Sequence, residues 1–110
     1  MEPIHVKSKY INEQITPVFR RYERKDGPTA LILNDLYGQQ VAKVSVNFDG
    51  NNLPDDEIAV KTYSENEWLM ENLIKQGFLE DTGREQPATP GYSFPICRMT
   101  PKLLAYKGDK

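Results

Sequence analysis

The sequence predicts an α+β domain in which an antiparallel β-sheet, a meander of three to five strands, carries one α-helix packed on a face. Three observations support this fold class. Short runs of β-branched and aromatic residues are separated by turn residues, residues 41–48 alternate between apolar and polar side chains, and residues 64–76 repeat apolar side chains at helical spacing.

The first half of the chain is expected to form three strands joined by short turns. Residues 18–24 mix aromatic residues with arginines, which is typical of an edge strand protected by charge. An Asp-Gly pair at residues 26–27 favours a tight hairpin before an apolar strand at residues 29–34. A turn at residues 35–40 then leads to the alternating strand, whose apolar side chains are Ala42, Val44, Val46 and Phe48.

The second half is expected to add two strands and a mobile loop. A polar loop leads to a fourth strand at residues 57–62. Residues 80–91 are polar and contain two prolines and two glycines, so they are expected to form a mobile excursion. Residues 92–98 alternate again and predict a last strand, in which Pro95 favours an edge position.

The helix at residues 64–76 is predicted from signals at its N-terminal end. Ser64 is a favoured N-cap residue, and Glu67 three residues later completes a capping box. Tyr63 and Trp68 have the spacing of a hydrophobic staple. Together these residues predict that the helix begins at Ser64.

The C-terminal end and the buried face of this helix are predicted as well. Gly77 can take the left-handed conformation that ends many helices, and Phe78 would then contact Leu73. The apolar face is expected to pack on the sheet. The helix side chains on that face are Leu69, Leu73 and Ile74, and their expected contacts in the sheet are Ile32, Val44, Val46 and Val60.

Size and composition indicate one globular domain. The chain has 110 residues, 38% hydrophobic and 27% charged, and no apolar run approaches the length of a membrane span. We expect a flexible N-terminal arm at residues 1–15, the domain at residues 16–100 and a C-terminal tail at residues 101–110. The single cysteine and the absence of a signal pattern favour a cytoplasmic protein.

Metal and nucleophilic chemistry have little support in the sequence. The only histidine, His5, lies far from the only cysteine, Cys97, and a zinc site needs three or four such ligands at short spacings. Cys97 lies in the last predicted strand and is expected to be a packing residue. No phosphate-binding glycine motif occurs. We therefore expect no metal, no cofactor and no catalytic residues.

Charge is unevenly distributed although the net charge is only −2. Residues 49–85 contain ten acidic and three basic residues, whereas residues 1–28 contain six basic and four acidic ones. Such an acidic segment either steers a basic partner or forms a solvated surface.

A second group of side chains combines arginines with aromatic rings, a pattern that can hold phosphates and stack bases. The pI of about 5.4 and the expected edge strand argue against this use of the group. Nucleic-acid binding therefore stays the alternative hypothesis rather than the leading one. Its site residues would be Phe19, Arg20, Arg21, Tyr22 and Arg24.

About two-thirds of the chain resembles a family of short bacterial and mobile-element proteins described only as a domain of unknown function (family 4313-like). The resemblance extends from Thr29 to Thr100. It is carried by the aliphatic strand, the Gly-containing turn and the V-S-V-N-F run at residues 44–48, then by Leu53-Pro54 with the acids and strand that follow, by residues 63–67, by Gly77, by Thr82-Gly83-Arg84 and by residues 95–98. It implies a small cytoplasmic protein of a mobile element with no established activity, and it supplies no catalytic residue.

These observations favour a non-enzymatic protein-binding module, with inhibition of a host defence protein as a sharper version. Its expected surface combines the acidic loop, one helix residue and the loop after the helix: Asp55, Asp56, Glu57, Glu71, Glu80, Asp81 and Arg84. A third class, an enzyme, would be built from Tyr63, Glu67, Arg84 and Arg98. The sequence leaves the oligomeric state open.

Overall fold

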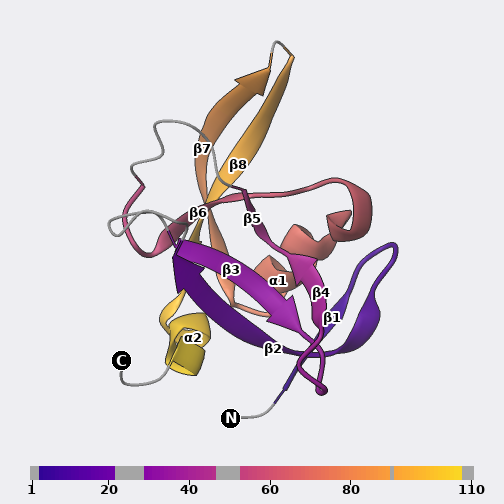
Figure 1. Cartoon of the computed structure of the whole chain (residues 1–110). Coiled ribbons are helices and arrows are strands. Elements are labelled where there is room, and N and C mark those ends of the chain that lie inside the picture. Colours follow the sequence, from indigo (N-terminus) through magenta and orange to yellow (C-terminus); the bar gives the residue numbers. More distant parts are fainter. Residues whose placement is uncertain (1–2, 22–28, 47–52, 90, 108–110) are drawn as a thin grey trace.

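Two four-stranded antiparallel sheets form the framework in a computed structural model that describes residues 3–21, 29–46, 53–89 and 91–107 (Figure 1). Sheet I has the order β1-β2-β3-β4, and sheet II has the order β5-β6-β8-β7. The strands are β1 (Ile4–Lys7), β2 (Asn12–Arg21), β3 (Thr29–Asn34), β4 (Gln40–Lys43), β5 (Ser45–Val46), β6 (Glu57–Val60), β7 (Leu79–Thr89) and β8 (Tyr92–Met99).

Helices are short in this fold. The α-helices of the described residues are α1 (Leu69–Lys75) and α2 (Pro101–Leu104), and the 3-10 helices are η1 (Ser64–Asn66) and η2 (Ala105–Lys107). The predicted α+β class is confirmed, but the helix is shorter than expected and the strands form two sheets rather than one. None of the helices in the described part of the chain is long and apolar enough to cross a membrane.

The chain passes from sheet I to sheet II at Val44, which is fully buried. Its N–H donates to the carbonyl of Leu31 in β3 (2.9 Å), and its carbonyl accepts from the N–H of Lys61 just after β6 (2.8 Å). The hydroxyl of the buried Ser45 accepts from the N–H of Leu31 (2.9 Å). These bonds connect the two sheets along one edge.

The predicted strand at residues 41–48 is therefore split between the sheets. Ala42 and Val44 are buried as the alternation predicts, but Ser45 is also buried and Val46 is only half-buried. The alternation of buried and exposed side chains is lost after Val44, because the backbone passes from sheet I to sheet II there and its side chains change direction relative to the core. Residues 47–48 lie outside the described residues.

The expected N-terminal arm is wrong for residues 4–15, which form β1 and the start of β2. Ile4 pairs with Ile15 and Val6 with Glu13, and both Ile15 and Val6 are fully buried. The pattern was hard to recognise because β1 has only four residues, so only two apolar side chains mark it. The expected C-terminal tail is likewise ordered as α2 and η2, and Leu103 is buried in the core.

The predicted edge strand at residues 18–24 is wrong in the order of the sheet, because β2 lies between β1 and β3. Residues 12–15 pair with β1, and residues 16–21 pair with β3. Beyond residue 15, no second strand pairs with β2 among the described residues, and η2 contacts it there. The Asp-Gly pair predicted to form the β2–β3 hairpin lies outside the described residues, although the two strands do pair antiparallel.

The predicted start of the helix at Ser64 is wrong. Ser64 has φ +60°, whereas an N-cap has extended backbone, and α1 begins after Trp68 without a side-chain cap. Two tertiary hydrogen bonds hold this segment away from helical geometry. The side-chain amide of the buried Asn66 donates to the Lys43 carbonyl (2.8 Å). The N–H of Lys9, which follows β1, donates to the Glu67 carbonyl (3.1 Å).

The predicted hydrophobic staple is also absent. Trp68 is 58% exposed, and Tyr63 packs against the rings of Tyr92 and Phe94 in β8.

The predicted end of the helix is confirmed. Gly77 has φ +84°, its N–H donates to the Ile74 carbonyl (3.0 Å), and the N–H of Phe78 donates to the Leu73 carbonyl (2.9 Å). This pair of bonds is the Schellman motif, which needs a residue that tolerates positive φ. Leu73 and Phe78 are both buried in the core, as the motif predicts.

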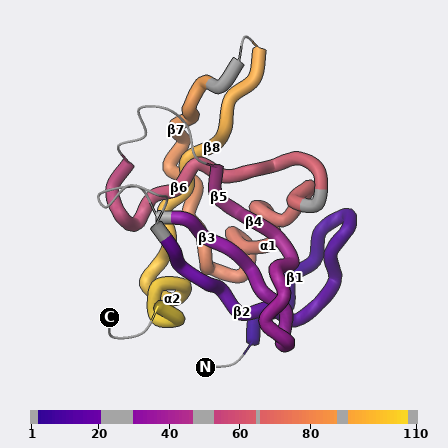
Figure 2. Tube along the Cα trace, viewed as in Figure 1, coloured from indigo at the N-terminus to yellow at the C-terminus, as the bar shows by residue number. Residues whose placement is uncertain are grey.

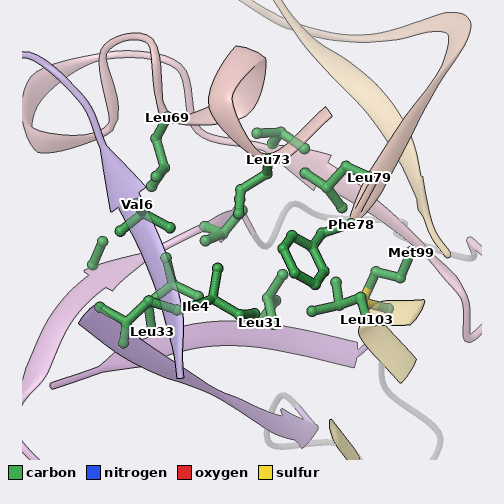
Figure 3. Close-up of a cluster of buried hydrophobic side chains, with 14 of the residues drawn as sticks. Ile4, Val6, Leu31, Leu33, Leu69, Leu73, Phe78, Leu79, Met99 and Leu103 are labelled. Atoms are coloured by element: carbon green, nitrogen blue, oxygen red, sulfur yellow. The ribbon is translucent and has the colours of Figure 1, made fainter. Parts of the chain in front are cut away.

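The two sheets, α1 and α2 share one hydrophobic core (Figure 3). Leu69 and Leu73 of α1 point toward Val6 and Leu31 of sheet I in this view. Val44 and Val60 belong to the core as expected, but Ile32 and Val46 are only half-buried and lie outside it. In β3 the inward residues are instead Leu31 and Leu33, because β3 consists of consecutive apolar residues and its sequence does not show which set faces inward.

Strand β7 corrects the expectation of a mobile excursion at residues 80–91. It is an edge strand of eleven residues, and with β8 it forms a long hairpin that extends away from the rest of the chain (Figure 1). Its polar sequence fits a hairpin with much of its surface in solvent. The expected edge position of Pro95 is wrong, since β8 lies between β6 and β7; the pairing with β6 ends at Ile96, so Pro95 removes no bond on that side.

Truncation of Leu73 tests the packing of α1. Leu73 is 1% exposed, so we expect Leu73→Ala to lower the free energy of unfolding by about 2–5 kcal/mol through lost burial and a cavity. Chemical denaturation measures this change. Glu71→Ala, on the exposed side of the same helix, is the control and should change stability by less than about 0.5 kcal/mol. Equal effects of the two substitutions would contradict this placement of α1.

Candidate functional site

The turn between β3 and β4 is held in one conformation by a set of local hydrogen bonds. The Asp35 carboxylate accepts from the N–H groups of Tyr37 (2.8 Å) and Gln39 (2.9 Å). The Asp35 backbone also donates to the Gln39 carbonyl (2.8 Å) and accepts from Gly38 (3.1 Å), which has φ +85°. Asp at the start of a turn and Gly at a positive φ are the residue types that this geometry favours.

This rigid turn presents two large apolar side chains to solvent. Leu36 is 58% exposed and Tyr37 is 92% exposed. A single exposed apolar residue is common on protein surfaces and needs no explanation. Two in succession, at a turn that polar residues usually occupy, form a projection suited to insertion into a partner.

A second candidate surface is the outer face of sheet II, which we define as the face turned away from the core. Residues directly opposite each other on paired strands share a face. The pairing therefore places on this face the β6 residues Glu57 and Ala59, the β8 residues Phe94, Ile96 and Arg98, and the β7 residues Glu80, Arg84 and Gln86.

A bulge in β7 sets the position of Arg84 on this face. Regular pairing from Asp81 opposite Cys97 would place Arg84 opposite Phe94, but a register shift places it opposite Ile96. The Thr82 hydroxyl donates to the Ile96 carbonyl (2.7 Å) and accepts from the Arg84 N–H (3.2 Å). The bulge moves Arg84 two positions along β8 toward Glu57.

Two ion pairs cross the outer face. Arg84 forms a short ion pair with Glu57, whose side chain is only 10% exposed, while that of Arg84 is 52% exposed. Arg98 pairs with Glu80 (3.3 Å), and both of these side chains are at least half exposed. In the first pair, therefore, the negative charge is buried beneath a guanidinium that faces solvent.

Three aromatic rings pack together near the tip of the β7–β8 hairpin, where Tyr92 pairs with Thr89. Tyr92 lies edge-on to Phe94 (ring centroids 5.1 Å apart) and to Tyr63 (6.1 Å). Phe94 is buried, whereas Tyr63 and Tyr92 are 49% and 39% exposed. The Lys61 ammonium lies over the Tyr63 ring, 5.2 Å from its centroid.

Most of the residues predicted to form one acidic binding surface lie near the starts of β6 and β7, on either side of the end of β8. Glu57, Glu80 and Arg84 come together, but within the two ion pairs. Asp55 and Asp56 lie in the turn before β6, and the Asp56 carbonyl accepts from the Met99 N–H (2.6 Å).

The two other acids of that predicted surface are not on the outer face, because Asp81 is paired with the core residue Cys97 and Glu71 belongs to a helix. Asp81 is exposed and accepts from the Gly83 N–H in the bulge (2.9 Å). Glu71 belongs to α1, which covers the core side of sheet II.

The predicted nucleic-acid set is divided between two faces of sheet I. Phe19 is paired with the buried Leu31 and packs against the core. Arg20 is paired with Ala30 on the opposite face and is exposed. Tyr22, Arg24 and the Arg21 side chain lie outside what the structure describes.

The residues considered for catalysis are dispersed. His5 lies in sheet I with its ring bonded to the Asn12 side chain (2.6 Å), whereas Cys97 is buried in sheet II. Glu67 forms an ion pair with Lys9 (3.7 Å), apart from the ion pairs of Arg84 and Arg98. Over the described ranges, no group of three His, Cys, Asp or Glu residues is placed to hold a metal ion.

The thiol of Cys97 is held in its neutral form. Burial raises its pKa from the ordinary value of 9.0 to about 12, and the negative charge of Asp81 adds to this increase. A nucleophilic cysteine needs a lowered pKa and some exposure, and Cys97 has neither. The prediction that Cys97 is a packing residue is confirmed by its position in the core.

Sequence reasoning missed Leu36 and Tyr37 because the turn was identified only as a connection. The available signal was a Leu-Tyr pair inside a segment that otherwise has turn composition. It also missed the pairing of Tyr63 with Tyr92, which depends on long-range strand order.

No protein-family model, curated protein or solved structure matches this chain. The family resemblance thus stays a prediction, and the candidate surfaces rest on geometry and chemistry.

Removal of each arginine tests the difference between the two ion pairs. Arg84→Ala leaves the Glu57 carboxylate buried without its cation, so we expect the free energy of unfolding to fall by about 1–2 kcal/mol, less than for a fully buried pair because Arg84 is half exposed. Arg98→Ala is the matched control and should cost less than about 0.5–1 kcal/mol. Urea denaturation at neutral pH measures both values, and a larger cost for Arg98→Ala would contradict this ranking.

The state of Cys97 can be tested by thiol labelling. At pH 8 we expect a disulfide reagent to react with the folded protein at least about a hundredfold more slowly than with the protein in denaturant, because burial blocks access and suppresses the thiolate. Release of the coloured thiol product gives both rates. Rapid labelling of the folded chain would show that Cys97 is accessible.

Proposed function

We propose that this protein is a non-enzymatic protein-binding module that docks through Leu36 and Tyr37 on the β3–β4 turn. The observation that carries this proposal is the combination of a turn held by four hydrogen bonds, two of them to the Asp35 carboxylate, with two neighbouring, largely exposed apolar side chains. The expected partner is a protein with an apolar pocket and a polar group at its base for the tyrosine hydroxyl.

The rigidity of the turn supports a docking role. Binding costs conformational entropy when a loop must be ordered, and a segment that already has its bound conformation avoids much of that cost. Tyrosine adds a large contact area with few rotatable bonds, and buried tyrosines are frequent energetic centres of protein interfaces. Leu36 beside it would enlarge the apolar contact.

The non-enzymatic part of the proposal rests on how the reactive groups are used. The thiol is buried and neutral. The Arg84 and Arg98 side chains of sheet II are paired with the carboxylates of Glu57 and Glu80. The predicted acidic surface is replaced in this proposal by the turn, because Glu57 is buried and Glu71 lies apart from the other acids.

Affinity capture with matched variants tests the proposal. The immobilised protein would be exposed to a nuclease-treated bacterial lysate, and captured proteins would be quantified by mass spectrometry. We expect Leu36→Ser combined with Tyr37→Ser to reduce a specific captured protein about tenfold or more, since losing central apolar contacts costs at least that much. Tyr37→Phe should retain most of the capture because the ring is preserved.

The control is Tyr10→Ser, which removes a tyrosine that is 63% exposed and lies between β1 and β2. It should capture the same proteins as the original chain. The proposal is wrong if the double variant captures every specific protein at the original level, or if Tyr10→Ser causes the same loss.

A further inference from the structure

The two half-exposed tyrosine rings on the outer face of sheet II form an aromatic platform, which we define as Tyr63 and Tyr92 supported by Phe94. The buried Phe94 ring contacts both tyrosines, so ring packing holds Tyr92 at the start of β8 against Tyr63 in the segment between β6 and η1. The Tyr92 hydroxyl also lies 3.5 Å from the Thr62 hydroxyl. An aromatic ring held in place with one side in solvent is a surface on which a planar group can stack.

Basic side chains extend from the platform along the outer face, with Lys61 at the platform itself, Arg84 opposite Ile96 and Arg98 six residues from Tyr92 in β8. Lys61 lies over Tyr63, and Arg84 and Arg98 are about half exposed on the same face. The carboxylate that pairs with Arg84 is buried, so a ligand in solvent meets the guanidinium and not the acid. A guanidinium has five N–H donors, so the short contact with Glu57 uses only part of the donor capacity of Arg84 for a phosphate to share.

The size and charge of this surface favour a nucleic-acid strand over a folded partner. A stable interface with another protein or a second copy needs roughly 800 Å² on each side, or about 20–30 residues. Two accessible rings with three cations instead match a few nucleotides, since one ring stacks one base and each cation meets one phosphate. Stacking also needs unpaired bases, which a duplex does not offer on its surface.

We propose that the outer face of sheet II binds single-stranded nucleic acid, with bases stacked on Tyr63 and Tyr92 and phosphates held by Arg84, Arg98 and Lys61. This site differs from the earlier basic and aromatic group on β2, whose Phe19 and Arg20 face opposite sides of sheet I.

The low pI of the whole chain does not reflect the charge of the outer face of sheet II. Its described charged residues include three bases against two acids, and one of those acids, Glu57, is buried. Because few phosphates are contacted, binding should be weak and should decrease as the salt concentration rises.

The proposed site is independent of the protein-docking turn. Figure 2 shows the β3–β4 turn and the tip of the β7–β8 hairpin at opposite ends of the molecule. Substitutions at one surface therefore serve as controls for the other, and either proposal can fail alone.

Fluorescence anisotropy with a labelled oligothymidylate of about a dozen nucleotides tests the site, since single-strand sites span about 4–16 nucleotides. We expect binding at low salt that weakens as salt is added, and weaker binding to a duplex of the same length. Tyr63→Ala combined with Tyr92→Ala should reduce affinity about tenfold or more. Tyr63→Phe combined with Tyr92→Phe should bind like the original chain, because stacking needs the ring and not the hydroxyl.

Tyr37→Ala is the matched control and should bind the oligonucleotide normally. Arg98→Gln provides a second measurement that does not disturb the ring cluster: it should weaken binding and reduce the slope of log affinity against log salt by about one. This variant keeps the test informative if the double alanine variant does not fold, which its circular dichroism spectrum would show.

Four results would overturn the proposal. These are the absence of oligonucleotide binding at low salt, unchanged affinity in a folded double alanine variant, an unchanged salt slope in Arg98→Gln, and duplex binding at least as tight as single-strand binding. Sedimentation of the original chain as a dimer that the double alanine variant loses would assign the face to a second copy instead.

Discussion

The backbone of Val44 is the point on which the rest of the structure depends. This one residue bonds through its N–H to β3 and through its carbonyl to the strand end after β6, so it belongs to both sheets at once. The neighbouring Ser45 hydroxyl satisfies the Leu31 N–H, which would otherwise be a buried donor without a partner where the sheets separate. With the sheets joined here, their inner faces enclose a core that α1 and α2 complete.

Because the two sheets are joined at one edge, the outer face of sheet II is not needed to enclose the core. Strand β6 is buried along its whole length, so Glu57 and Ala59 lie beneath the surface of the outer face rather than on it. The bulge at Thr82-Gly83 then brings Arg84 over Glu57, and Gly83 supplies the positive φ that the bulge requires. Arg84 in β7 thus lies opposite Ile96 and near Arg98 in β8 on this face.

Local signals were reliable wherever the neighbouring residues decided the conformation. Gly77 ends α1 as its sequence context predicts, because the Schellman motif involves only residues within one turn of the helix. The strand at residues 29–34 and the turn after it were also predicted correctly, since the turn is stabilised by the side chain and backbone of Asp35 itself. For the helix end and the turn, the partners of the hydrogen bonds are neighbours in sequence.

Local signals failed where a distant contact was stronger. Ser64 has the sequence of an N-cap, but the Asn66 bond to Lys43 and the Glu67 bond to Lys9 fix this segment in another conformation. These contacts join residues more than twenty positions apart, so no local pattern reveals them. The polar residues of β7 likewise become a strand only because β8 pairs with them.

The sequence by itself determined the α+β class, the helix end at Gly77, the β3 strand with its following turn, and the packing role of Cys97. Local backbone preferences and apolar content are enough for these features. The tertiary structure alone decided the division into two sheets, the inward residues of β3, the burial of Glu57 and the meeting of Tyr63 with Tyr92. Those features depend on which strands pair and in what register, and the free energy of that pairing comes from contacts between residues distant in the chain.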